Sequence, residues 1–159
     1  MHRKVLIILT ALVFSSCIKD QFKAEIPSYV HIESIDLETD SFEGSDSQKL
    51  TDAWITMDGS FLGAFELPCI IPILADGAHE FRVSSGIKAN GISATRIIYP
   101  FFEICDLYIK DGDTYQASTS NIVNLHKDST VVLKATTSYK KNIAFLFVED
   151  FEDAGAVIE

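Results

Sequence analysis

Two Asp-Gly steps, Asp58-Gly59 and Asp76-Gly77, constrain the fold more than any other feature of the sequence. Both lie within residues 54–83, where they punctuate apolar runs. Asp and Gly tolerate the positive φ angles that tight turns require, so each step predicts a turn between short antiparallel strands. No catalytic motif lies in this stretch. The pattern therefore predicts β-structure and does not by itself indicate a function.

The first predicted strand carries an irregularity. Apolar and polar residues alternate over residues 29–38, but the apolar parity flips between Ile32 and Ile35. One extra residue in a strand exchanges its two faces, so we predict a bulge at Glu33-Ser34. The polar residues 40–48 that follow predict a surface loop.

Two prolines interrupt the longer apolar runs. Pro72 lies within residues 70–74 and Pro100 within residues 96–109. Proline cannot donate a hydrogen bond to the middle of a ladder. We therefore assign the first run to a sheet edge or to a crossing between sheets. We predict that the second run is split into two strands or forms one bent edge strand.

The last third of the chain predicts a hairpin and a central strand. Residues 121–125 and 130–134 flank a polar tip, which predicts a hairpin. Residues 143–148 are apolar on both faces, as in a central strand. After residue 17 no stretch of ten or more residues has helical periodicity. We predict an all-β fold, an antiparallel β-sandwich or small open barrel of about seven strands.

The N-terminus has the features of a secretory signal. Residues 1–4 are basic, residues 5–14 form an apolar run, and Ser15-Ser16-Cys17 follow. The run is shorter than the roughly 20 apolar residues that a spanning helix needs. Cys17 resembles the cysteine of the bacterial lipobox, which is diacylated after the preceding peptide is removed. Phe14 stands where that pattern prefers Leu, and the alternative is a buried N-terminal strand with a core cysteine.

This resemblance implies a domain order and a location. Residues 1–16 are expected to be a lipoprotein signal peptide, 17–26 a tether, 27–149 the β-sandwich, and 150–159 an acidic tail or the start of a missing second domain. Acylation of Cys17 implies a lipid-anchored protein of the outer membrane, at its periplasmic face or at the cell surface. Lys19-Asp20 resembles the surface-export signals of Bacteroidetes lipoproteins, which favours the cell surface.

A further resemblance covers residues 52–86. Met57-Asp58-Gly59, Leu62-Gly63, Pro68, Leu74, Gly77, His79, Val83 and Gly86 resemble the pattern of the PEGA domain, a small immunoglobulin-like β-sandwich module of bacterial envelope proteins. With the lipobox and Tyr99-Pro100-Phe101-Phe102, the chain looks like the N-terminal half of uncharacterised Bacteroidetes lipoproteins. Neither resemblance implies catalytic residues.

The net charge and the spacing of possible metal ligands limit the kinds of partner that the chain is expected to bind. After residue 16 the chain has 11 basic and 23 acidic residues, which argues against binding to nucleic acid or docking on anionic lipid. The four histidines lack zinc-ligand spacing, and the acidic stretches lack an EF-hand pattern, so we predict no metal and no cofactor. Cys69 and Cys105 are left as a disulfide or as two buried free thiols.

Aromatic residues are the remaining candidates for binding. The set consists of Trp54, Arg96, Tyr99, Phe101 and Phe102. Aromatic rings can stack on sugars or anchor a protein partner, although core packing explains them as well. We predict a non-enzymatic lipoprotein that acts as a structural or adaptor module for an envelope partner. The alternative is a surface glycan-binding lipoprotein, with exposed coplanar rings near Tyr99–Phe102.

Overall fold

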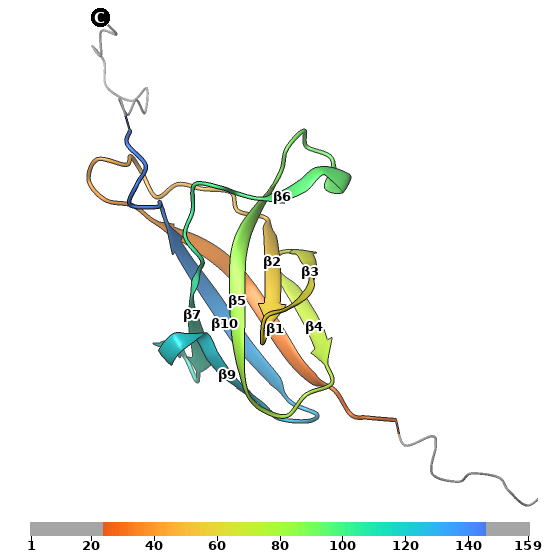
Figure 1. Ribbon diagram of the computed structural model, residues 1–159. Helices are drawn as coiled ribbons and strands as arrows, with labels where there is room; N and C mark the ends of the chain where they lie inside the picture. Colours follow the sequence, from red (N-terminus) through yellow and green to blue (C-terminus); the bar gives the residue numbers. More distant parts are fainter. Residues whose placement is uncertain (1–23, 146–159) are drawn as a thin grey trace, which may run out of the picture.

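Two β-sheets form the part of the chain that the structure describes, residues 24–145 of a computed structural model (Figure 1). The strands are β1 (Ser28–Glu38), β2 (Asp52–Met57), β3 (Ser60–Glu66), β4 (Cys69–Ile73), β5 (Gly77–Lys88), β6 (Arg96–Ile98), β7 (Asp106–Asp111), β8 (Thr114–Ala117), β9 (Ile122–Leu125) and β10 (Thr130–Ser138). The 3₁₀ turns η1 (Ser93–Thr95) and η2 (Thr119–Asn121) are the helical elements of this range. Sheet 1 has the order β4-β1-β10-β7-β8, and sheet 2 has the order β3-β2-β5-β6, with β9 also paired to β5.

The sandwich itself is confirmed. One hydrophobic cluster holds inward side chains of both sheets, among them Ile32 and Leu133 from sheet 1 and Ile55 and Phe81 from sheet 2, all with no exposed surface. Ten strands replace the expected seven or so. Part of the excess is β8, whose polar sequence at a sheet edge lacks the apolar alternation that identifies a strand.

The predicted irregularity of the first strand is present. β1 is one continuous strand that pairs in parallel with β10, and the register shifts between Ile32 and Ile35. Ile32 and Ile35 are both buried, although they are three residues apart. The extra residue therefore keeps both apolar segments of β1 directed into the core.

The two Asp-Gly steps behave differently. Asp58 and Gly59 have φ angles of 50° and 79° and form the two-residue turn of the β2–β3 hairpin, with Met57 opposite Ser60, as predicted. Gly77 has a φ of 100°, but Asp76-Gly77 joins β4 of sheet 1 to β5 of sheet 2. These strands do not pair, so the second step makes a crossing between sheets rather than a hairpin.

Both proline predictions are confirmed. Pro72 lies in β4, which is the edge strand of sheet 1. The chain also changes sheets on entering β4, since β3 belongs to sheet 2. Pro100 lies between β6 and β7 and so divides the second apolar run into two strands.

Two predictions for the last third are wrong. β9 and β10 do not form a hairpin, because β9 pairs with β5 while β10 pairs with β1 and β7. Both segments are nevertheless strands, and Val123 and Leu133 both reach the core. Ile143–Phe145 is not a strand, and Phe145 is partly exposed. Residues 146–148 of the predicted central strand lie outside the described range.

The two remaining cysteines are free thiols. Cys105 is fully buried and Cys69 is half-buried, and they form no disulfide. Burial raises the pKa of the Cys105 thiol to about 12 and also raises the pKa of Cys69. Both thiols therefore stay protonated and serve as small apolar core groups.

The described chain enters and leaves the sandwich at opposite ends (Figure 1). β1 and β10 run in the same direction, with Tyr29 opposite Thr130 and Glu38 opposite Ser138. The predicted signal peptide, Cys17, most of the tether and the acidic tail lie outside the described residues. No helix within residues 24–145 is long and apolar enough to cross a membrane.

Candidate functional site

Trp54 lies on the outer face of sheet 2. It alternates with the buried Ala53 and Ile55 in β2 and stacks on Phe61, with ring centroids 5.2 Å apart and an interplanar angle of 29°. A Cβ added to Gly86 in the neighbouring β5 would come within 2.8 Å of the Trp54 ring. The indole Nε1 is buried and has no hydrogen-bond partner among the described residues. The ring is therefore packed onto the sheet rather than displayed.

Arg96 is committed to an ion-pair network. Its Nε donates to Oδ1 of Asp52, and its Nη2 donates to Oε2 of Glu66 at 3.2 Å. Lys88 Nζ lies 3.8 Å from Asp52 and 3.4 Å from Glu66. The Asp52 side chain is completely buried. These four residues, the Asp52 network, connect β2, β3, β5 and β6, and so Arg96 has a structural role.

The remaining predicted residues, Tyr99, Phe101 and Phe102, join two residues that were not predicted, Tyr139 and Phe145, in an aromatic cluster. Successive rings meet edge to face, with centroids 4.5 to 5.4 Å apart and interplanar angles of 62° to 81°. Phe102 is buried, and Phe101 is about half exposed (49%). The rings are thus not coplanar, and their geometry favours packing over a sugar-stacking platform.

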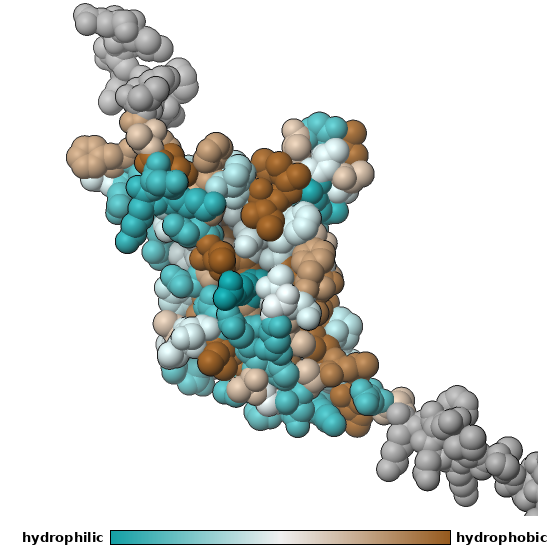
Figure 2. All heavy atoms as spheres, in the orientation of Figure 1, coloured by the Kyte–Doolittle hydropathy of each residue, from teal (hydrophilic) through white to brown (hydrophobic). Residues whose placement is uncertain are grey.

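Exposed apolar side chains also accompany β6. Figure 2 shows hydrophobic side chains gathered at this strand, where Ile97 and Ile98 are exposed. They lie on a three-residue strand at the edge of sheet 2. The structure thus divides the predicted site among the Trp54 stack, the Asp52 network and the aromatic cluster.

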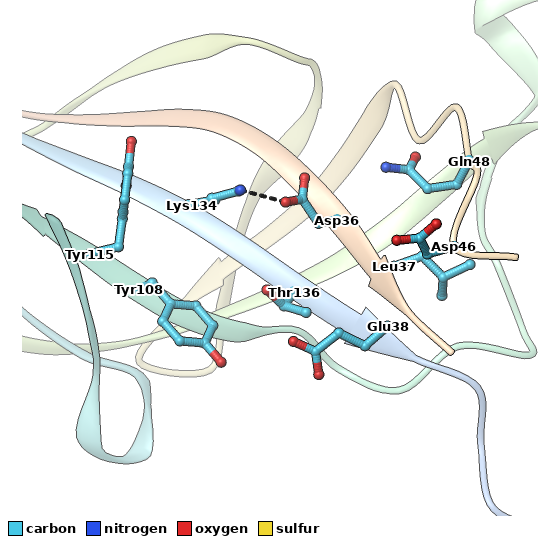
Figure 3. A pocket seen from close by; sticks show the side chains of 9 residues that line it. All are labelled: Asp36, Leu37, Glu38, Asp46, Gln48, Tyr108, Tyr115, Lys134 and Thr136. Atoms are coloured by element: carbon cyan, nitrogen blue, oxygen red, sulfur yellow. Dashed lines mark ion pairs between the residues drawn. The ribbon is translucent and has the colours of Figure 1, made fainter. Parts of the chain in front are cut away.

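A groove that the sequence analysis did not identify lies on sheet 1. It has a volume of about 620 Å³ and is seen from close by in Figure 3. We call it the tyrosine groove and define it by its lining residues: Asp36, Leu37, Glu38, Asp46, Gln48, Tyr108, Tyr115, Lys134 and Thr136. In β10 the lining residues alternate with the buried Leu133, Ala135 and Thr137, so they stand on the outer face of the sheet.

Ion pairs and hydrogen bonds hold the floor of the groove. Lys134 Nζ lies 2.5 Å from Oδ2 of Asp36, and this contact raises the pKa of Lys134. The Tyr115 hydroxyl donates to Glu33, and Lys110 Nζ lies 3.6 Å from the same carboxylate. The Tyr115 hydrogen bond lowers the pKa of Glu33 and raises that of Tyr115. These contacts fix side chains of four neighbouring strands, β1, β10, β7 and β8.

The rim of the groove comes from the loop between β1 and β2. Gln48 Nε2 donates to the carbonyl of Ile35 at 3.2 Å, and the Leu50 N–H donates to Gln48 Oε1 at 2.6 Å. One amide side chain thus ties this loop to β1. The loop carries Asp46, and the tie keeps that carboxylate beside the end of the strand. The rim is therefore positioned before any ligand arrives.

The groove offers hydrogen-bonding groups that the fold does not use. No hydrogen bond within residues 24–145 engages the Tyr108 hydroxyl, the Thr136 hydroxyl, or the carboxylates of Glu38 and Asp46. Over the same range, no cluster of three or more His, Cys, Asp or Glu residues could hold a metal ion. The arrangement suits binding through many hydrogen bonds. Alternation in β7 and β10 places Tyr108 and Thr136 on a polar face, but nothing in the sequence predicts that they meet Glu38 and Asp46.

No family model, no curated protein and no solved structure matches the chain.

Proposed function

We propose that this chain is a lipid-anchored, non-enzymatic envelope lipoprotein that acts as a structural or adaptor module at the outer membrane or cell surface. The proposal keeps the resemblance to Bacteroidetes lipoproteins and to the PEGA module, with Cys17 as the acylated residue. One observation carries it: the described chain enters and leaves the sandwich at opposite ends (Figure 1).

Parallel pairing of β1 with β10 is the cause of this geometry. The register runs from Tyr29 opposite Thr130 to Glu38 opposite Ser138, so both strands point away from the N-terminal end. An antiparallel pair of first and last strands would return the chain to its starting end. A domain tethered at its N-terminal end therefore presents its C-terminal end away from the anchor. This arrangement suits a spacer or an adaptor.

The polar contacts support a structural role. Asp52 is the most deeply buried carboxylate of the described residues, and Arg96 and Lys88 neutralise it. Such a group holds strands together and is shielded from a substrate. Asp36 is likewise paired, with Lys134. The edge-to-face rings of the aromatic cluster do not favour glycan binding at Tyr99–Phe102.

Metabolic labelling with a palmitate analogue tests the anchor. Wild type is expected to incorporate label, Cys17→Ala is expected to lose it, and Cys69→Ala is expected to keep it as the matched control. Labelling that persists in Cys17→Ala contradicts the proposal. Protease treatment of intact cells then separates the two faces of the membrane: cleavage indicates the cell surface, and protection indicates the periplasmic face.

Site-specific photo-crosslinking tests the adaptor role. Phe101 marks the exit end, because its carbonyl accepts a hydrogen bond from the N–H of Lys140, shortly after β10. Glu25 marks the entry end. A crosslinker at Phe101 is expected to capture a defined envelope protein that one at Glu25 does not capture. Identical products from both positions contradict a partner held at the exit end.

A further inference from the structure

We propose that the tyrosine groove is a binding site for a neutral saccharide chain. This inference goes beyond the adaptor function and does not depend on the lipid anchor. It also differs from the glycan platform expected near Tyr99–Phe102, since none of those residues lines the groove.

The lining matches the chemistry of a sugar. A saccharide presents hydroxyls that both donate and accept hydrogen bonds, and ring faces made of C–H groups. Glu38 and Asp46 supply carboxylate acceptors, while Tyr108 and Thr136 supply hydroxyls that do either. Tyrosine adds an aromatic ring with a polar end, which suits a ligand with both kinds of surface. The groove thus combines hydrogen-bonding groups with a stacking surface (Figure 3).

Part of the lining is also held in place. Asp36 and Lys134 fix each other, and Tyr115 is fixed by its hydrogen bond to Glu33. Gln48 ties the rim to β1 through the Ile35 carbonyl. Side chains that are already ordered lose little entropy when a ligand binds. A weakly interacting ligand such as a sugar depends on this saving.

Charge selects a neutral ligand. Three carboxylates, from Asp36, Glu38 and Asp46, line the groove against one ammonium group, so a polyanion is repelled. A cation that stacked on Tyr108 would meet Lys134, which is directly opposite Tyr108 in the β10–β7 register. An uncharged ring avoids both conflicts. The Lys134 ammonium group can still donate to a sugar hydroxyl, because it has three N–H donors.

The test is a binding titration of the full chain, in which calorimetry measures the affinity and NMR chemical shifts locate the site. The probes are neutral xylo-, cello-, manno- and laminari-hexaose, with a heparin hexasaccharide and hexalysine as charged comparisons. At least one neutral hexaose is expected to bind and to shift the signals of β1, β7 and β10. Binding only of heparin or only of hexalysine overturns the proposal, and so does the failure of all four neutral probes.

Variants locate the site. Tyr108→Ala is expected to weaken binding of the best neutral hexaose by about tenfold, since it removes the ring on which the sugar stacks. Tyr108→Phe and Thr136→Val retain the shape of the groove, so they report on its hydroxyls even if Tyr108→Ala does not fold. Phe101→Ala is the matched control in the aromatic cluster and is expected to bind as wild type does. Affinity that falls in Phe101→Ala and stays constant in the groove variants overturns the assignment.

Discussion

The outer faces of the two sheets carry the same pairing of carboxylates with cations, but at opposite extremes of exposure. On sheet 2 the Asp52 side chain is 0% exposed beneath Arg96 and Lys88. On sheet 1 the side chains of Asp36 and Lys134 are each 40% exposed. The first carboxylate has exchanged water for protein partners, whereas the second remains in contact with water.

This difference in exposure distinguishes carboxylates that hold the fold together from carboxylates that a ligand can reach. A buried carboxylate has lost its hydration, and its partners must replace it, so removing either side leaves an uncompensated charge. An exposed pair gains little, because water and salt compete with it. The Asp52 network can therefore lock four strands, while the pairs of sheet 1 keep their side chains accessible to a ligand.

The largest effect is expected for Asp52→Ala. It leaves Arg96 and Lys88 with only the exposed Glu66 as a partner and removes about 3–5 kcal/mol from the free energy of unfolding. Urea denaturation measures the change. Glu66→Gln is the control, because the Glu66 side chain is 61% exposed in the same network and its loss is expected to cost about 1 kcal/mol or less. If both variants lose the same free energy of unfolding, burial is not what makes Asp52 important.

A second variant tests the packing beside this network. Gly86→Ala places a Cβ 2.8 Å from the Trp54 ring, and this ring cannot move without losing its contact with Phe61. The expected loss is about 1–3 kcal/mol. Trp54 is the sole tryptophan of the chain, so its fluorescence reports the displacement. Ser84→Ala is the control, since Ser84 is opposite Trp54 in the register and already carries a Cβ.

On sheet 1, Asp36→Asn is expected to change the free energy of unfolding by only about 0–1 kcal/mol, because the pair that it breaks is exposed. Urea denaturation beside Asp52→Ala gives the comparison directly. A loss as large as that of Asp52→Ala means that exposure does not separate the two faces. The comparison would then have to be abandoned.

Local sequence signals predicted the parts of the fold that depend on neighbouring residues. The parity flip between Ile32 and Ile35 gave the bulge, Asp58-Gly59 gave the hairpin, and Pro72 gave the edge strand. Each of these features follows from steric limits within a few residues of the chain.

These local signals did not predict which distant strands pair with each other. Residues 121–125 and 130–134 are two strand-like segments on either side of a polar tip, and this local pattern is the same whether the two strands pair with each other or with other strands. The burial of Asp52 depends on Arg96, which is 44 residues away. The tyrosine groove likewise depends on the parallel pairing of β1 with β10. Such contacts are set by topology, which local periodicity does not specify.

The smallest effect is expected for the pair His79 and Asp58, at the turn between β2 and β3. Its contribution to the stability of the fold depends on pH. His79 Nδ1 lies 2.7 Å from Asp58 Oδ2, and the side chains are 21% and 50% exposed. The hydrogen bond that the His79 ring donates to Asp58 raises the pKa of His79 above its ordinary value of 6.5 and lowers the pKa of Asp58 below its ordinary value of 3.8. The pair is therefore strongest where both groups are charged.

The sign follows from these directions. A raised histidine pKa stabilises the fold fully below 6.5, and this contribution disappears as the pH rises through the raised value. A lowered carboxyl pKa stabilises the fold above pH 3.8, and this contribution disappears as the pH falls through the lowered value.

We expect Asp58→Asn to lower the melting temperature more at about pH 5 than at about pH 8. His126→Gln is the control, because His126 lies 3.8 Å from Asp76 and its side chain is 74% exposed. A difference between wild type and Asp58→Asn that is constant from acid to alkaline pH contradicts an ionic contribution at this turn, and would leave Asp58 with only its hydrogen bond to the Glu80 N–H.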